Sequence, residues 1–167
     1  MRFLGVALVS SAVVLGACGG GSKDAAPAAT STPAAATPAA APAAAGAALP
    51  ITGKTWEVKM IGDGNSYKFE PADLTIKAGD GIKFTVVSTP PHNVAFDVAQ
   101  AGLADAGVKA QLDANMGPNK MGELSSPLLL NVGDSYTISF AGVKPGKYLF
   151  NCTPHLAMNM KGSVTVQ

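Results

Sequence analysis

The chain has 167 residues, of which 47% are hydrophobic and 14% are charged, and its formal net charge is +1. This near-neutral charge argues against nucleic-acid binding and provides no overall field that would select a strongly charged partner. The first elements in chain order are a positive residue, Arg2, and an apolar run over residues 3–15. The run is too short to span a bilayer, and the pattern is typical of a signal peptide.

The apolar run ends in a possible processing motif, Leu15-Gly16-Ala17-Cys18. This motif resembles the lipobox of bacterial lipoproteins. The resemblance implies that residues 1–17 are a lipoprotein signal peptide and that Cys18 carries lipid after cleavage. The alternative is an ordinary secretory signal with an incidental cysteine. Both interpretations predict export, and the first predicts a protein lipid-anchored to a membrane, on the periplasmic side or at the cell surface.

Residues 18–51 are rich in Ala, Pro, Gly, Ser and Thr and contain no aromatic side chain. Such a segment has few large apolar groups to bury and cannot offset the entropy of ordering. Repeated prolines also oppose the helix that the alanines would favour. We therefore predict a disordered tether, which would reach some tens of Å if it follows about 5–6 Å × √n.

Residues 52–167 form the predicted folded domain, in which short alternating runs are separated by turn residues. Large apolar residues mark these runs at 56–60, 74–76, 82–86, 128–130, 136–140, 148–150 and 164–166. Between them, Leu103, Ala106, Ala110 and Leu112 have near-helical spacing. The sequence therefore predicts an all-β protein, a Greek-key β-sandwich or barrel with one short helix in a crossing loop.

The last strands lead into a run with unusual chemistry, NCTPHLAMNMKG. Alternation places Tyr148, Phe150 and Cys152 on one face of a strand, and the two aromatic residues identify it as the core face. Cys152 should therefore point inward at the end of the sandwich, next to the loop 153–161.

One thiolate, two imidazoles and a thioether form the ligand set of a blue-copper electron-transfer site. Cys152, His155 and Met160 supply three of these groups, and His92 supplies the other imidazole. If Cys18 is acylated, Cys152 is the one remaining thiol, and metal ligation would protect it in an oxidising compartment. The alternatives are a turn histidine with a gap-filling methionine, in an exported sandwich without metal.

These runs resemble the cupredoxin family, and plastocyanin most closely within it. The matching residues are Pro91 to Val94, Phe96-Asp97, Cys152, Pro154, His155, Met160 and the final run 161–166. The resemblance implies one copper ion, cycling between Cu(II) and Cu(I). It implies the ligands His92, Cys152, His155 and Met160, with the thioether weak and axial. It also implies that Asn93 ties the two ligand loops together.

Two alternatives concern the ligands themselves. Zinc would accept thiolate and imidazole, but a thioether favours copper because it is a soft ligand suited to Cu(I). Met158 competes with Met160 for the axial place. Met160 is preferred because the spacing of the family falls there.

The chain also departs from the higher-plant plastocyanins, which have a tyrosine just before the ligand cysteine. Asn151 stands there, and the acidic residues are spread along the chain. Docking of a transient redox partner is therefore expected at the apolar end, around His155 and Leu156.

The function predicted from the sequence is one-electron transfer by a monomer, outside the cytoplasm, and no catalytic activity is expected. Copper oxidases that resemble this fold carry histidines on both sides of the cysteine, whereas Asn151 and Thr153 flank Cys152. The alternative is an exported copper-binding or copper-delivery protein without a redox role. An intense blue Cu(II) form would favour the carrier, and a colourless Cu(I) binder would favour delivery.

Overall fold

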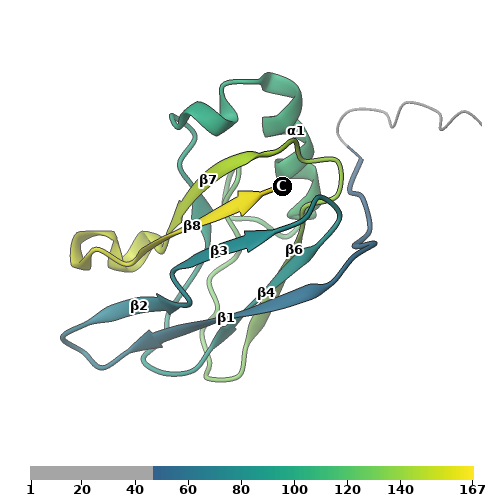
Figure 1. Cartoon of the computed structure of the whole chain (residues 1–167). Helices are drawn as coiled ribbons and strands as arrows, with labels where there is room; N and C mark the ends of the chain where they lie inside the picture. The colour runs from purple at the N-terminus through teal and green to yellow at the C-terminus, as the bar shows by residue number, and fades with distance from the viewer. Residues whose placement is uncertain (1–46) are drawn as a thin grey trace, which may run out of the picture. The chain divides into compact units, whose positions relative to one another are not determined.

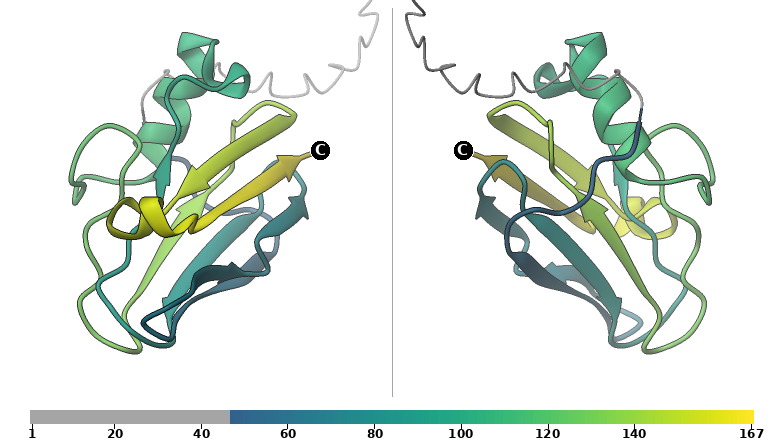
Figure 2. Two further views of the ribbon diagram at one scale, coloured as in Figure 1. Left: turned by 90° about the vertical axis from the view of Figure 1, so that its left-hand side faces the viewer. Right: turned by 90° about the vertical axis from the view of Figure 1, so that its right-hand side faces the viewer.

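Two four-stranded sheets make up most of the part that the structure, a computed structural model, describes: residues 47–167. One sheet has the order β2-β1-β4-β6 and the other the order β3-β8-β7-β5. The strands are β1 (Thr55–Gly62), β2 (Tyr67–Glu70), β3 (Asp73–Ile76), β4 (Gly81–Val86), β5 (Ala95–Phe96), β6 (Ser135–Ser139), β7 (Gly146–Asn151) and β8 (Lys161–Val166). Both layers, with the helical segment outside them, can be followed in Figure 1 and Figure 2. The predicted Greek-key β-sandwich with one short helix is confirmed.

Strand pairing brings two loops to one end of the sandwich. β1 pairs in parallel with β4, and β3 in parallel with β8. β5 follows the loop after β4 and pairs antiparallel with β7, so that Ala95 lies opposite Asn151. The loop 87–94 and the loop 152–160 therefore meet. We call this the His92 end of the domain, and the opposite end the far end.

The core between the sheets is aromatic. Phe150 makes edge-on contacts with Phe69 and Phe84, at centroid distances of 4.8 and 5.4 Å. Edge-to-face pairs of this kind contribute about 0.5–1.5 kcal/mol beyond the burial of their surface. Tyr148, Phe150 and Cys152 are all buried, which confirms the core face predicted for this strand.

The helical segment differs in detail from the prediction. A 3-10 turn, η1 (Ala101–Leu103), precedes α1 (Ala106–Asn115). The carboxylate of Asp105 caps α1 by accepting hydrogen bonds from the backbone N–H groups of residues 107 and 108. Of the four residues with near-helical spacing, Leu103 and Leu112 are buried and the two alanines are exposed, and Val108 is also buried. Small alanine side chains bury little surface, so the face is set by the larger Val108.

One strand assignment was wrong, and two short strands, β2 and β5, were not predicted. Residues 128–130 form no strand, because only Leu129 pairs, in a single bridge with His92. Leu128 and Leu130 are exposed, so their hydrophobicity does not report burial in a sheet. Conversely, β2 was not predicted, since its two aromatic residues alternate over only four positions.

Residues 47–54 join the domain at the far end. The backbone carbonyl of Ala47 accepts a hydrogen bond from Gln111 of α1, and Asn115 accepts one from the Leu49 N–H group. Farther along, the Thr52 N–H group donates to the carbonyl of Gly79. The predicted domain boundary between residues 51 and 52 stays a prediction. Among the described residues, no helix is long and apolar enough to cross a membrane.

Candidate metal centre

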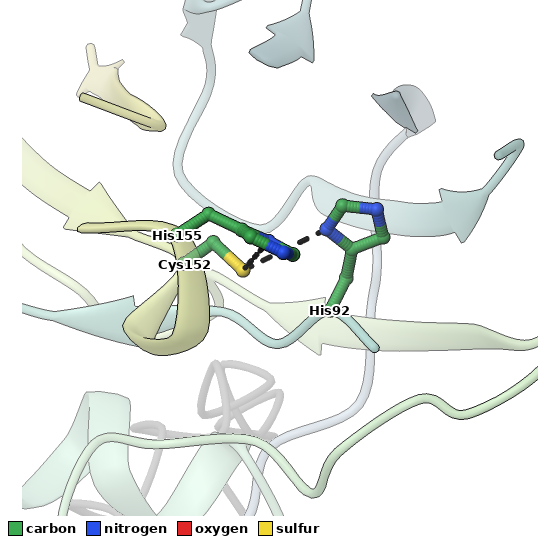
Figure 3. Close-up of side chains that lie close together, drawn as sticks. All are labelled: His92, Cys152 and His155. Atoms are coloured by element: carbon green, nitrogen blue, oxygen red, sulfur yellow. Dashed lines mark hydrogen bonds between the residues drawn. The ribbon is translucent and has the colours of Figure 1, made fainter. Parts of the chain in front are cut away.

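Three of the predicted ligands converge at the His92 end. His92 lies in the loop after β4, Cys152 follows β7 directly, and His155 lies in η2 (Thr153–Met158). All three residues are buried, and one ligand atom from each lies within 4.8 Å of the other two. Figure 3 shows both imidazoles directed at the Cys152 sulfur.

The orientation of His92 is fixed on both sides. Its backbone is held by a reciprocal pair of hydrogen bonds with Leu129, of 3.1 and 2.8 Å. The Nε2 atom of its ring lies 2.9 Å from the carbonyl oxygen of Ser88. Because a carbonyl oxygen only accepts, Nε2 carries the hydrogen, and the lone pair is on Nδ1. That Nδ1 atom lies 3.7 Å from the Sγ atom of Cys152.

His155 reaches the same sulfur from the other side. Its Nδ1 atom lies 3.4 Å from the Cys152 Sγ atom. Pro154 stands at the start of η2, where its missing N–H group costs no helical hydrogen bond. The His155 backbone departs from helical geometry, with φ −113° and ψ 19°. This kink and the hydrogen bond from His155 N–H to the Cys152 carbonyl (3.1 Å) keep the two ligands close together.

Burial favours the neutral form of each ligand. It lowers the pKa of His92, and it lowers the pKa of His155, where the neighbouring His92 adds to the effect. Burial also raises the pKa of the Cys152 thiol. Two neutral imidazoles beside a sulfur are a suitable set for a cation, which would then stabilise the thiolate.

The two candidate axial residues differ in exposure. Met160 is fully buried, whereas half of the Met158 surface is exposed. The Met160 carbonyl accepts a hydrogen bond from the Cys152 N–H group (3.1 Å), and its own N–H group donates to the His155 carbonyl (3.2 Å). The backbone of Met160 is thus tied to both ligands of its loop.

Asn93 joins the two ligand loops. Its Oδ1 atom accepts a 2.7 Å hydrogen bond from the Thr153 N–H group, and its Nδ2 atom donates to the Thr153 hydroxyl at 3.1 Å. A third bond, of 3.3 Å, runs from Nδ2 to the hydroxyl of Ser125. Asn93 is completely buried, so these bonds are not open to competition from solvent at the amide itself.

The surface over the ligands is apolar in part. His155 is 7% exposed, and Leu156, next to it, is 45% exposed. Asn151, which stands before the ligand cysteine, is half-buried, and Pro154 is exposed. Leu156 is thus an apolar side chain next to His155 that a partner could cover.

Two contributors to the site were not predicted from the sequence. Ser88 orients His92, and the ring of Tyr67 stacks on His155 with a centroid distance of 3.7 Å. Both depend on contacts between distant segments, and neither residue type signals such a role. The aromatic alternation of Tyr67 and Phe69 is the only local signal that could have placed β2.

The residues present fit a copper ion. A buried cysteine sulfur and two imidazole nitrogens, all within 4.8 Å of one another, are a soft set with room for one ion, and a buried thioether residue follows in the same loop. The predicted signal peptide, Cys18 and most of the predicted tether lie outside the described residues.

Comparison with known proteins agrees with a copper site. The family model described as copper binding proteins, plastocyanin/azurin family, matches residues 56–167. Plastocyanin from Nostoc punctiforme is 37% identical over 115 residues, which cover 68% of this chain and 75% of the relative. Plastocyanin from Dryopteris crassirhizoma is 35% identical over 111 residues, covering 66% of this chain and 99% of the relative. The solved structure of its oxidised form superposes with a TM-score of 0.50 at 32% identity, covering 66% of this chain and 99% of that one.

Proposed function

The chain belongs to the plastocyanin/azurin family of copper-binding proteins, and from this membership we propose that it carries single electrons between redox partners outside the cytoplasm. One bound copper ion would supply a Cu(II)/Cu(I) couple, which accepts and returns one electron. The observation that carries this function is the buried convergence of His92, Cys152 and His155. The protein is an electron carrier rather than an enzyme, and both of its histidines belong to this single site.

The chain itself holds the donor atoms in place. Ser88 orients His92, the backbone hydrogen bond to Cys152 orients His155, and Asn93 links the loops that carry them. These contacts do not depend on the charge of the site. The ligand positions should therefore change little between the two oxidation states, and a small change of geometry favours fast electron transfer.

Met160 is the fourth ligand in this proposal, as a weak axial thioether. Its burial and its backbone bonds to Cys152 and His155 support this role, whereas Met158 is half exposed. A thioether beside a thiolate favours copper over zinc as the working metal.

The proposed docking surface consists of His155 and Leu156. His155, of which 7% is exposed, is followed by the exposed Leu156 side chain. Small apolar surfaces of this kind suit transient encounters between redox proteins. The protein acts as a monomer, and the same surface contacts each partner in turn.

Docking can be tested without a known partner by measuring electron self-exchange, in which a second copy of the protein is the partner. Leu156→Glu places a negative charge on this surface and should slow self-exchange between the Cu(I) and Cu(II) forms. Thr137→Glu is the control, since it adds the same charge at an exposed position of β6, which belongs to the sheet without β7 and β8. An equal effect of both variants would contradict docking at Leu156.

The proposed location rests on the N-terminal sequence. The apolar run and the motif ending in Cys18 support export and lipid anchoring, and the Ala- and Pro-rich tether would join the anchor to the domain. The electron carrier would then work close to a membrane without crossing it.

The test of the function is the visible spectrum after Cu(II) is added to the purified domain. We expect an intense blue band, because thiolate-to-copper charge transfer gives blue sites their colour, and we expect Cys152→Ser to abolish it. Fast self-exchange should accompany the colour. A colourless protein that binds only Cu(I) would instead support copper delivery without a redox role.

A further inference from the structure

The ring of Tyr67 lies flat against a copper ligand. Its centroid is 3.7 Å from that of His155, and the two planes differ by only 13°. The same ring meets His92 edge-on, with a centroid distance of 6.1 Å and an interplanar angle of 62°. Tyr67 is half-buried, so its ring separates one face of the His155 imidazole from solvent.

A glycine makes the space that the ring occupies. Tyr67 begins β2 and pairs with Gly62, the last residue of β1. A Cβ atom on Gly62 would lie 2.6 Å from Cε1 of the Tyr67 ring, which is too close for a real contact. Any side chain at position 62 would therefore displace the ring.

The position of Gly62 is in turn fixed to the loop that carries His92. The Ser88 hydroxyl accepts a 3.0 Å hydrogen bond from the Gly62 N–H group and donates a 2.6 Å bond to the Gly62 carbonyl. The backbone carbonyl of Ser88 also holds the His92 ring. One residue thus links the orientation of His92 to the place where the Tyr67 ring rests.

We propose that Tyr67 is a positioning residue, which holds the His155 imidazole in its metal-binding orientation and keeps water away from it. The proposal rests on the proposed function for the identity of the metal, but the stack itself is a property of the chain. Aromatic pairs in general contribute roughly a two- to tenfold factor to an equilibrium constant. The hydrophobic shell of a metal site also influences its redox potential through solvent access.

Two effects should follow when the ring is removed. His155 loses the contact that fixes the plane of its ring, so copper should dissociate about two- to tenfold faster. Water also gains access to His155, and water stabilises the more highly charged Cu(II) state. The reduction potential should therefore fall.

The variants are Tyr67→Leu, Tyr67→Phe and, as control, Tyr136→Leu. The leucine removes the aromatic ring, and the phenylalanine keeps the ring without its hydroxyl. Tyr136 is a half-buried tyrosine of β6, opposite Phe84, so its loss costs packing elsewhere in the sandwich.

The first readout needs no metal. Protons that lie over an aromatic ring resonate upfield, so the His155 ring protons of the metal-free protein should move downfield in Tyr67→Leu and stay near the wild-type values in Tyr67→Phe. The potential should fall, and copper release should accelerate, in the leucine variant alone. Tyr136→Leu should change the stability but none of these three quantities.

Gly62→Ala provides a second route, because its methyl group would lie 2.6 Å from the Tyr67 ring, and 2.9 Å from the Thr89 Cβ atom, while residue 67 stays a tyrosine. It should reproduce the downfield shift and the fall in potential. Unchanged His155 resonances and potential in Tyr67→Leu would overturn the positioning role and leave the blue-copper function intact. Equal changes in Tyr136→Leu would overturn it as well. By contrast, a wild-type protein that forms no blue Cu(II) site would refute the proposed function, and the metal-free resonances would still test the stack.

Discussion

The substitution Asn93→Ala should separate the two ligand loops. It removes three hydrogen bonds, two to Thr153 and one to Ser125. Each such bond contributes a net stabilisation of about 0.5–1.5 kcal/mol. Thr153 is exposed, so water can replace its lost partner, and the total loss should lie toward the lower part of the summed range. We expect the free energy of unfolding of the metal-free protein to fall by about 2–3 kcal/mol, measured by urea denaturation.

The same change should loosen the metal site, because His92 stands on one loop while Cys152 and His155 stand on the other. Once the loops move independently, the ligands no longer act as one preformed set. We expect copper to transfer to a strong chelator about tenfold faster, which corresponds to about 1.4 kcal/mol of the coupling between the loops. The decay of the blue absorption gives this rate.

Asn115→Ala is the matched control, since it also removes a buried asparagine. Asn115 lies at the far end, where its amide nitrogen donates to the carbonyls of Ser139 and Ala141. Its Oδ1 atom accepts from the Leu49 N–H group and from the Gln111 side chain. This variant should lose about 2–4 kcal/mol of stability and keep the wild-type rate of copper release. If the two variants release copper at the same rate, the reasoning about Asn93 is refuted.

Three further predictions concern separate parts of the chain. Met160→Leu should keep the blue colour and raise the reduction potential, because Cu(II) loses a weak donor, whereas Met158→Leu should have little effect in voltammetry. Asp80→Asn should lower stability at neutral pH by about 1.5–3 kcal/mol. The hydrogen bond from Trp56 is the main cause that lowers the pKa of Asp80. The ionised Asp80 carboxylate therefore stabilises the fold above its unfolded pKa of about 3.9, and this stabilisation disappears as the pH falls through the lower pKa of the folded state. Urea denaturation below pH 4 should therefore show a smaller difference between this variant and wild type. Cys18→Ser should move the protein from the membrane to the soluble fraction with an unchanged copper spectrum, and retention at the membrane would contradict acylation of Cys18.

The sequence was most informative where the signal is local. Cys152, His155 and Met160 fall within nine consecutive positions, and alternation alone predicted that Cys152 points inward. The longer strands, with three alternating apolar residues each, were also predicted. Strand β2 was missed because its alternation covers only four residues, and with it the sequence missed Tyr67, the closest aromatic neighbour of His155.

Other features depend on partners that are far apart in the chain. Gln111 and Asn115 are buried polar residues, and the groups they bind lie at residues 47–49 and 139–141. No local pattern predicts such a residue on the buried face of a helix. The run 128–130 shows the opposite problem, because two of its three leucines are exposed. Hydrophobicity alone could not distinguish a strand of the core from a surface loop beside His92.

The two ends of the domain have different roles. At the far end, Asp80 accepts hydrogen bonds from the backbone of Lys54 and Lys77 and from the Trp56 indole. These bonds fix the segment that leads into β1, and β1 then runs to Gly62 at the His92 end. Residues 47–54 thus join the domain away from the ligands. A redox partner that approaches His155 would not have to displace this segment, so we expect Cys18→Ser and Leu156→Glu to act independently, the first on membrane retention and the second on self-exchange.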